Sequence, residues 1–206
     1  MPKLFHAPGS CSNGILLLLE ETGIAYETET IDLAKGANRA PDYLAQNPKG
    51  KVPALRTDDG EVVTEFPAVA LCIATTYPQA GLWPDDPMAR VRTLEMLDFI
   101  VGSIHMRGFT FVKMPQKFID TAEGQAALRA HGEKEIVKGL TVMSDTLGAE
   151  DYMLGTFGLA DVAAFYVLRW CAMDGVAMPD NLAALLARLS DRPAAQAVLP
   201  QLVRAG

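Results

Sequence analysis

The sequence has little cysteine and no long hydrophobic run. Its three cysteines, Cys11, Cys72 and Cys171, are too few and too far apart for a disulfide framework or a cysteine-based metal site. The longest apolar run, residues 15–19, ends at two glutamates, well short of the roughly 20 apolar residues of a membrane helix. We therefore expect a protein without a metal ion, a disulfide framework or a membrane partner.

The sequence also lacks an excess of positive charge. Its formal net charge is -7 at pH 7, which argues against nucleic acid as a partner. The first residues lead straight into strand-like sequence, so we expect no cleavable signal and a cytoplasmic location. The stretch from Asp32 to Arg56 reverses the balance, with five basic residues against two acidic ones. A solvated loop explains any one of these lysines, but the local reversal suits a small anionic ligand.

Strand and helix patterns alternate over residues 1–77. The second strand alternates apolar and polar residues, which is typical of a half-buried strand. The order of the elements predicts an α/β domain with a mixed sheet and helices on its faces. We predict strands at residues 3–6, 25–31, 54–56 and 62–64, and helices at residues 13–22, 41–46 and 66–77.

Residues 78–87 hold three prolines and one glycine, which is typical of a linker. Beyond them the apolar residues recur with a helical period, which predicts an all-helical domain over residues 88–206. The chain thus divides into a small α/β domain at residues 1–77 and an all-α domain, joined by the linker. The helices expected in the second domain are residues 89–109, 121–147, 159–171 and 182–189, with a short tail from residue 193.

Cys11 is the most informative residue of the sequence. It lies between the first predicted strand and the first predicted helix, in a turn shaped by Pro8 and Gly9. A helix N-terminus favours the thiolate, so we expect an exposed sulfur with a lowered pKa. No second cysteine follows nearby, which excludes a dithiol mechanism and requires an external thiol to resolve any disulfide on Cys11. The other two cysteines are interpreted as inert and buried, and Ser12 as the first cap of the helix.

Two further segments indicate how an extended peptide could be held. Pro53 precedes a strand, where proline cannot donate to the sheet. A cis Val52–Pro53 bond would turn the Val52 backbone toward a ligand, and a plain turn proline fits the pattern equally well. Glu65 can accept from a ligand ammonium, while the Phe66 N–H can meet a carboxylate at a helix start. An α-amino acid carries both charges, although an ordinary acidic residue at a helix start is the simpler interpretation.

Together these segments resemble the glutathione S-transferases. The resemblance rests on residues 8–12, 47–55 and 64–65, in this order, and the cysteine is similar to that of the bacterial beta class. Residues 99–109, which include His105, resemble the beta-class helix that points a histidine at the glutathione sulfur. The likeness covers essentially the whole chain.

The resemblance implies the fold, the partners and the site. The fold would be a thioredoxin-like N-terminal domain plus an all-α C-terminal domain, usually dimeric, with the active site between the domains. Glutathione would be the cosubstrate, without a metal, and a small hydrophobic electrophile the second substrate. The site residues that it implies are catalytic Cys11 and His105; Lys35, Lys51, Val52, a cis Pro53, Glu65 and Phe66 for glutathione; and Phe109, Phe111, Met114 and Trp170 for the hydrophobic cleft.

The chain departs from the family pattern at several positions. His6 stands where a tyrosine is common, and Phe66 stands where serine or glycine is usual. Residues 159–161 resemble the buried N-capping segment of the family, but Gly158 replaces the usual Ser or Thr. The reciprocal cap of that helix is therefore expected to be half present.

We therefore predict a glutathione S-transferase that conjugates glutathione to a small hydrophobic electrophile, or reduces such a compound with it. In one alternative, a thiol-disulfide oxidoreductase or peroxidase, Cys11 is the nucleophile and a second glutathione releases its mixed disulfide. In another, the chain carries hydrophobic ligands without turnover, which the apolar side chain of Phe66 suggests. The third alternative is a protein-interaction module that uses only the fold.

Overall fold

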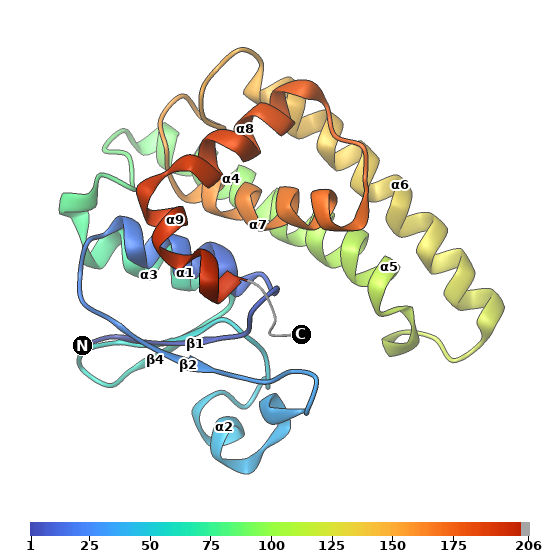
Figure 1. The fold of residues 1–206 in the computed structure, drawn as a ribbon, viewed down its shortest axis with the longest axis horizontal. Coiled ribbons are helices and arrows are strands. Elements are labelled where there is room, and N and C mark those ends of the chain that lie inside the picture. Colours follow the sequence, from blue (N-terminus) through green and yellow to red (C-terminus); the bar gives the residue numbers. More distant parts are fainter. Residues whose placement is uncertain (203–206) are drawn as a thin grey trace. The chain divides into compact units, whose positions relative to one another are not determined.

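The computed structural model describes residues 1–202, and the chain divides into two compact units (Figure 1). One unit comprises Met1–Asp85 with the segment from Arg188 onward, and the other comprises Asp86–Ala187. The helix α8 (Asp180–Asp191) runs from the second unit into the first. The domain limits expected from the sequence, 1–77 and 88–206, stay a prediction, and their last four residues lie outside the described part of the chain.

A four-stranded mixed sheet forms the centre of the first unit. β1 pairs in parallel with β2 and antiparallel with β3, which in turn pairs antiparallel with β4. The strand order is β2-β1-β3-β4, so the mixed sheet expected from the sequence is confirmed. The strands are β1 (Lys3–His6), β2 (Glu27–Thr30), β3 (Ala54–Arg56) and β4 (Val62–Thr64).

Four helices belong to the same unit. In Figure 1, α1, α3 and α9 lie on one side of the sheet and α2 lies on the other. Residues 12–19 of α1 are all buried, because apolar side chains surround that helix and both α3 and α9 pack against it. The helices are α1 (Ser12–Glu21), α2 (Pro41–Gln46), α3 (Phe66–Thr76) and α9 (Pro193–Leu202).

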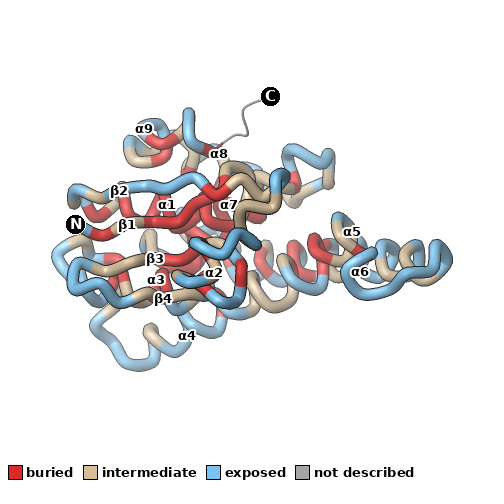
Figure 2. The backbone as a smooth tube through the Cα atoms, turned by 90° about the horizontal axis from the view of Figure 1, so that it is seen from below, coloured by how far each residue is buried: buried red, intermediate tan, exposed pale blue. Residues whose placement is uncertain are grey.

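β2 differs from the half-buried strand that the sequence predicted. All of its residues are exposed, and in Figure 2 it is pale blue beside the largely buried β1 and β3. The reason is its place at the sheet edge and its polar composition, since Glu27 and Glu29 both pair with Lys3 at 3.5 and 3.6 Å. Ile31, the apolar residue that follows, is buried outside the strand.

The second unit is built from helices. The all-α domain expected from the sequence is confirmed, since residues 86–187 contain no strand. Short 3₁₀ turns, η1 (Ala37–Arg39) and η2 (Pro78–Ala80) in the first unit and η4 (Pro115–Lys117) in the second, connect longer elements. The helices of the second unit are α4 (Pro87–Phe99), the π-helix η3 (Ile100–Phe109), α5 (Thr110–Lys113), α6 (Ala122–Leu147) and α7 (Leu159–Asp174).

η3 interrupts what the sequence predicted as a single helix over residues 89–109. α4 changes at Ile100 into a π-helix, which continues into α5. A Cβ on Gly108 would lie 2.6 Å from Ile136, and a Cβ on Gly132 would lie 2.7 Å from the Gly108 carbonyl oxygen. These glycines therefore allow η3 and α6 to approach closely. π-helical turns are frequent at functional sites, and η3 carries His105.

α7 begins at a buried carboxylate and has residues 159–168 completely buried. Asp161, which is 1% exposed, accepts hydrogen bonds from the backbone N–H groups of Met153 at 2.9 Å and Gly158 at 3.0 Å. Gly158 has no side chain to return such a bond, so the cap is half present, as expected. The two bonds tie the preceding loop to the start of the helix.

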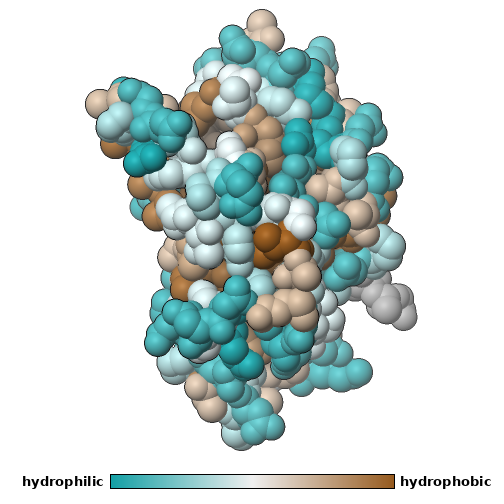
Figure 3. All heavy atoms as spheres, turned by 90° about the vertical axis from the view of Figure 1, so that its left-hand side faces the viewer, coloured by the Kyte–Doolittle hydropathy of each residue, from teal (hydrophilic) through white to brown (hydrophobic). Residues whose placement is uncertain are grey.

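One face of the molecule shows how hydrophilic and hydrophobic side chains are distributed on it (Figure 3). On the face shown in Figure 3, hydrophilic side chains predominate and hydrophobic groups form separate patches. Exposed large apolar residues, such as Met88, Val137 and Met173, are scattered along the sequence, and singly exposed apolar residues need no functional explanation. Within the described residues, no helix has the length and apolar character needed to cross a membrane.

Candidate functional site

The loop between β1 and α1 forms the centre of the candidate site in the first unit. Cys11 is the N-cap residue of α1, and Gly9 has a φ of 77°, a value that glycine adopts without strain. The Cys11 thiol donates to the carbonyl oxygen of Val52 over a distance of 3.6 Å. The fold thus brings together two residues that the sequence analysis selected from separate segments.

The Cys11 thiol is buried, whereas the sequence analysis expected an exposed thiolate. The residue is only 8% exposed, and burial raises the pKa of its thiol to about 12. Hydrogen bonds from the backbone N–H groups of Cys11 and Ser12 lower this pKa, Glu65 raises it and Lys51 lowers it. The helix terminus therefore acts in the expected direction, but desolvation is larger, and the expected lowered pKa is wrong for that reason.

Ser12 does not cap α1, although the sequence analysis expected it to. Cys11 takes the N-cap position, so the buried Ser12 hydroxyl turns back toward β1. It lies 2.7 Å from His6 Nδ1 and 2.7 Å from Ser10 Oγ, and it accepts from the Ala7 backbone N–H at 3.0 Å. His6 is itself 1% exposed, and burial lowers the pKa of its imidazole.

The Val52–Pro53 peptide bond is cis, as the resemblance implies. The turn before this bond is fixed by two side chains, one from α2 and one from the residue that follows it. The Tyr43 hydroxyl and the Asn47 amide both donate to the Lys51 carbonyl oxygen, at 2.5 and 2.8 Å. The Lys51 side chain is left exposed, and Val52 is half-buried. Two side chains therefore hold the Lys51 backbone in this turn, and the charged Lys51 side chain remains exposed.

Glu65 has an unusual backbone where β4 meets α3. Its φ of 73° lies in a region that residues other than glycine rarely adopt, and such conformations cluster at ligand sites. Its carboxylate pairs with Lys49, with 3.0 Å between Nζ and Oε1, and Lys49 also donates to Thr64 Oγ1 at 2.9 Å. The sequence analysis missed Lys49, which was visible only as one basic residue of the stretch with reversed charge.

Lys35 and Phe66 stand in contrasting surroundings. The Lys35 side chain is 86% exposed, and its ion pair is with Asp32 of the same loop, at 3.3 Å. Phe66 is the first residue of α3 and its ring is buried. Phe66 therefore contributes packing as well as a backbone N–H at a helix start. Within residues 1–202, no group of three or more potential metal ligands occurs.

His105 lies in η3 beside two aromatic residues of α7 in the second unit. Its Nδ1 is 3.3 Å from the Tyr166 hydroxyl oxygen, and its ring packs edge-to-face on Trp170, with 4.9 Å between centroids. Trp170 packs in the same manner on Phe109, at 5.3 Å. The sequence analysis missed the buried Tyr166, although its place four residues before Trp170 puts both on one helix face.

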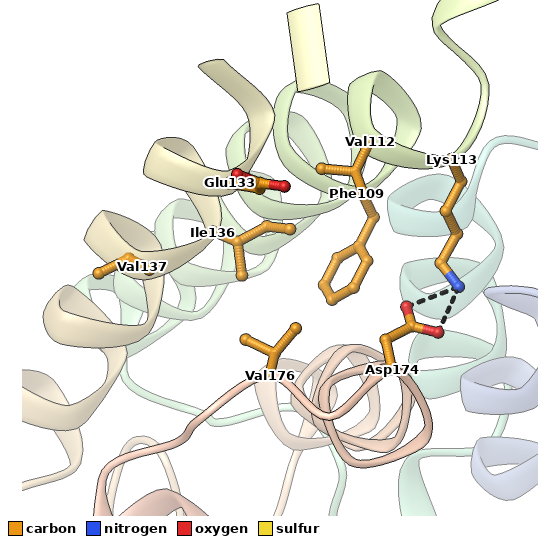
Figure 4. A pocket seen from close by; sticks show the side chains of 8 residues that line it. All are labelled: Phe109, Val112, Lys113, Glu133, Ile136, Val137, Asp174 and Val176. Atoms are coloured by element: carbon orange, nitrogen blue, oxygen red, sulfur yellow. Dashed lines mark hydrogen bonds and ion pairs between the residues drawn. The ribbon is translucent and has the colours of Figure 1, made fainter. Parts of the chain in front are cut away.

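A cavity of about 490 Å³ lies in the helical unit (Figure 4). The Phe109 ring points into it, and Lys113 pairs with Asp174 at 2.6 Å on one side. Phe109 was expected to line a hydrophobic cleft and lines this cavity, whereas the other residues expected with it do not: Phe111, Met114 and Trp170. Its walls include apolar Phe109, Ile136 and Val176, and charged Lys113, Glu133 and Asp174.

Comparison with known proteins identifies the family. The sequence model described as "Glutathione S-transferase, N-terminal domain" matches residues 9–76, which contain Cys11, the Val52–Pro53 bond and Glu65. Over 206 residues, the chain is 34% identical to glutathione S-transferase GstA of Escherichia coli O157:H7, and the match covers 96% of each sequence. The chain belongs to the glutathione S-transferase family.

Solved glutathione transferases have the same fold. A glutathione transferase homologue from Sulfitobacter with bound glutathione matches with a TM-score of 0.88 at 28% identity, over 97% of each chain. A bacterial beta-class glutathione S-transferase from Sphingomonas chungbukensis matches with a TM-score of 0.81 at 33% identity, over 98% of this chain and 100% of the other. The expected thioredoxin-like domain with an all-α domain is thereby confirmed.

In this glutathione S-transferase, the residues predicted for glutathione and those predicted for the hydrophobic substrate belong to different units. Cys11 and Val52 share a hydrogen bond in the first unit, and the charge of Glu65 acts on the same thiol. His105 and Trp170 are in contact in the second unit. The roles of these residues toward a substrate stay predictions.

Proposed function

We propose that this glutathione S-transferase holds glutathione on its first unit and joins the glutathione sulfur to a small hydrophobic electrophile. The observation that carries the proposal is the hydrogen bond of 3.6 Å between the Cys11 thiol and the Val52 carbonyl. A tripeptide paired along the Val52 backbone, as an added strand would be, has its own cysteine beside Cys11. The half-buried Val52 and the cis Pro53 support this interpretation.

Charged groups of the first unit suit the two ends of glutathione, which carries two carboxylates and one ammonium. Glu65 accepts from the ammonium of the γ-glutamyl end, and the Phe66 N–H at the start of α3 meets its carboxylate. The exposed Lys51 and Lys35 attract the carboxylates. Lys49 extends this set, because its ion pair of 3.0 Å holds the Glu65 carboxylate in place.

The raised pKa of Cys11 favours conjugation over disulfide chemistry. At a pKa of about 12, the thiol stays protonated near neutral pH, where it donates a hydrogen bond and is a poor nucleophile. We infer that the S–H group turns from Val52 to the glutathione thiolate and stabilises it. The glutathione proton passes to solvent, the sulfur lone pair forms the bond to carbon, and the leaving group departs with its electron pair.

Binding and turnover in matched variants test the proposal. We would measure the Kd for glutathione and the rate of conjugation to 1-chloro-2,4-dinitrobenzene. Glu65→Gln should weaken glutathione binding about tenfold or more, because a charge-assisted bond is lost. Glu61→Gln, which alters an exposed acidic residue before β4, should leave both measurements unchanged. Cys11→Ala should lower kcat with little change in Kd. A folded wild-type protein that does not bind glutathione would overturn the proposal.

Incubation with oxidised glutathione tests the redox alternative. The intact mass of the wild type and of Cys11→Ala would be measured in parallel. The protonated, buried Cys11 thiol should form no glutathione adduct, so any adduct on the partly exposed Cys72 should be the same in both proteins. A single adduct on the wild type, absent from the variant and removed by reduced glutathione, would favour a thiol-disulfide oxidoreductase or peroxidase in which Cys11 is the nucleophile.

The cavity of the helical unit favours a second candidate function, the carriage of hydrophobic ligands. Its volume of about 490 Å³ falls within the range of small-molecule sites, and the almost fully buried Phe109 forms part of its wall. An apolar fluorescent probe that binds the wild type, and binds Phe109→Ala more weakly, would support carriage. Carriage would also require that the protein turns over none of several electrophiles, because a transferase binds apolar compounds too.

The resemblance supports three further parts of the proposal. His105, whose Nδ1 lies beside the Tyr166 hydroxyl, is proposed as a second catalytic hydrogen-bond donor to the thiols. The protein is proposed to be a cytoplasmic homodimer. Equilibrium sedimentation should then give twice the chain mass of 22.2 kDa. His105→Leu should lower kcat without a matching change in the Kd for glutathione.

A further inference from the structure

A chain of buried and partly buried hydrogen bonds passes through the loop that carries Cys11. It begins at Ser10, whose hydroxyl lies 2.7 Å from that of Ser12, and continues from Ser12 to His6 Nδ1, also at 2.7 Å. His6 Nε2 lies 3.0 Å from the backbone carbonyl oxygen of Gln201. The Ser12 backbone N–H also donates to the Ser10 hydroxyl, at 3.2 Å. The two serines that flank Cys11 are therefore hydrogen-bonded to each other.

The direction of donation in this chain follows from its last member. A carbonyl oxygen only accepts, so Nε2 of His6 carries the proton that bonds to Gln201. The imidazole is neutral, since burial lowers its pKa, and its Nδ1 must then accept. The Ser12 hydroxyl has one proton and two acceptors in reach, Nδ1 at 2.7 Å and the Ala7 carbonyl oxygen at 3.3 Å. With the proton on the shorter bond to Nδ1, the Ser10 hydroxyl donates to Ser12. The side-chain bonds from Ser10 through Ser12 and His6 thus point from the loop toward α9.

The end of α9 holds the same loop from a second direction. The Gly9 backbone N–H and the Asn13 side-chain amide both donate to the Leu202 carbonyl oxygen, each at 3.0 Å. His6 adds its bond to Gln201, the preceding residue. Carbonyls in the last turn of a helix have no partner within the helix, and these bonds supply one. α9 therefore acts as a support for the loop as well as a cover for α1.

We propose that His6 is a positioning residue of the glutathione site, which fixes the loop carrying Cys11 by accepting from Ser12 and donating to Gln201. The inference rests on the proposed function of Cys11. Because Cys11 lies between Ser10 and Ser12, the bonds between these two serines restrain its backbone. Removal of the acceptor at His6 leaves the Ser12 proton only the longer bond of 3.3 Å to the Ala7 carbonyl oxygen, and movement of the loop relieves the cost of that weaker bond.

Variants of His6 and Ser12 test the proposal. His6→Leu removes both ring nitrogens, and Ser12→Ala removes the central hydroxyl. His6→Asn keeps an acceptor near the position of Nδ1. One measurement, the rate at which a neutral thiol reagent labels Cys11 as followed by peptide mass spectrometry, needs no glutathione. The other separates KM for glutathione from kcat in the conjugation reaction.

We expect His6→Leu and Ser12→Ala to raise both the Cys11 labelling rate and KM for glutathione about tenfold, with a smaller change in kcat. His6→Asn should return both quantities to within about threefold of the wild type. The matched control is Ser144→Ala in the second unit, because the Ser144 hydroxyl bonds to Asn181 Oδ1 over the same 2.7 Å. This control should lower stability and leave labelling and KM unchanged.

The two measurements keep the inference separate from the proposed function. Wild-type labelling rates in folded His6→Leu and Ser12→Ala would overturn the positioning role, whether or not glutathione binds. A wild type that fails to bind glutathione would overturn the proposed function, while labelling would still decide whether His6 fixes the loop. Should His6→Leu not fold, Ser12→Ala decides, since it removes a single oxygen atom.

Discussion

Two segments of the molecule bury a cysteine: the loop at residues 7–13 in the first unit and α7 in the second. Burial raises the pKa of both thiols, Cys11 and Cys171, to about 12. Around Cys11, two backbone N–H groups and Lys51 oppose this rise and the charge of Glu65 adds to it. Around Cys171, the charge of Asp174 adds to the rise and only the residue's own N–H opposes it. The two thiols therefore reach the same pKa in different surroundings, and the surroundings of Cys11 are better suited to a charged sulfur.

The same two segments differ in the buried polar side chain that anchors them. In α7 the anchor is a carboxylate, Asp161, which accepts two backbone N–H bonds at the helix start, ten residues before Cys171. In the loop the anchor is a neutral imidazole, His6, bonded to the residue next to Cys11. The carboxylate anchor stabilises the start of a helix. The other, on our proposal, also positions a sulfur atom.

Replacement of Asp161 by alanine should have the largest effect on stability. It leaves the N–H groups of Met153 and Gly158 without their acceptor, and we expect a loss of about 3 kcal/mol in the free energy of unfolding. Chemical denaturation measures this loss, and the Kd of the folded variant for glutathione should not change. Asp180→Ala, which alters an exposed acid at the start of α8, should cost less than about 0.5 kcal/mol. A loss at Asp161 no greater than this would remove the contrast between the two anchors.

Local patterns in the sequence predicted much of the fold around these segments. The predicted bounds of β1, α2, β3 and β4 agree with the structure, because turn residues and strand alternation act over a few positions. The exposure of β2 could not be predicted in that way, since it depends on the strand's place at the sheet edge. Family resemblance, not periodicity, supplied the cis bond before Pro53.

The candidate site was less accessible to sequence reasoning than the fold. The helix start beside Cys11 was visible, but the burial that outweighs it is produced by the whole unit. His6 and Gln201 lie 195 positions apart, and Lys49 and Glu65 come from different loops. No local pattern reports such contacts. His6 was noticed only as a departure from a common tyrosine, which gave no sign of its bond to Ser12.

The labelling order of the three cysteines would sharpen the comparison between Cys11 and Cys171. Cys72 is partly exposed, Cys11 is 8% exposed, and Cys171 is fully buried within α7. We expect a neutral thiol reagent at about pH 8 to label Cys72 first and Cys171 last, at least about tenfold more slowly than Cys11. Peptide mass spectrometry follows each site, and Cys72→Ala should remove only the fastest phase. Labelling of Cys171 as fast as Cys11 would show that the two surroundings are equivalent in practice.

The smallest expected effect concerns pH and the neutral anchor of the loop. Burial lowers the pKa of folded His6 below the ordinary value of 6.5, so the unfolded chain takes up a proton at a higher pH than the folded protein does. Between pH 6.5 and the lowered pKa of His6 in the folded protein, the unfolded state binds more protons than the folded state does. The free energy of unfolding therefore falls as the pH falls through this window, and the stability that His6 contributes is fully present only above it.

Denaturation midpoints from about pH 8 to pH 5, for the wild type and His6→Asn, would isolate this effect. The His6 ring bonds to a hydroxyl and a carbonyl, neither of which carries a charge that offsets an added proton. The other histidines, His105 and His131, are common to both proteins, so the difference between the two slopes belongs to position 6. The wild type should lose more stability toward acid than the variant. Equal slopes would show that protonation of His6 costs the fold nothing, and the distinction between a neutral anchor in the loop and a carboxylate anchor in α7 would then have no energetic basis.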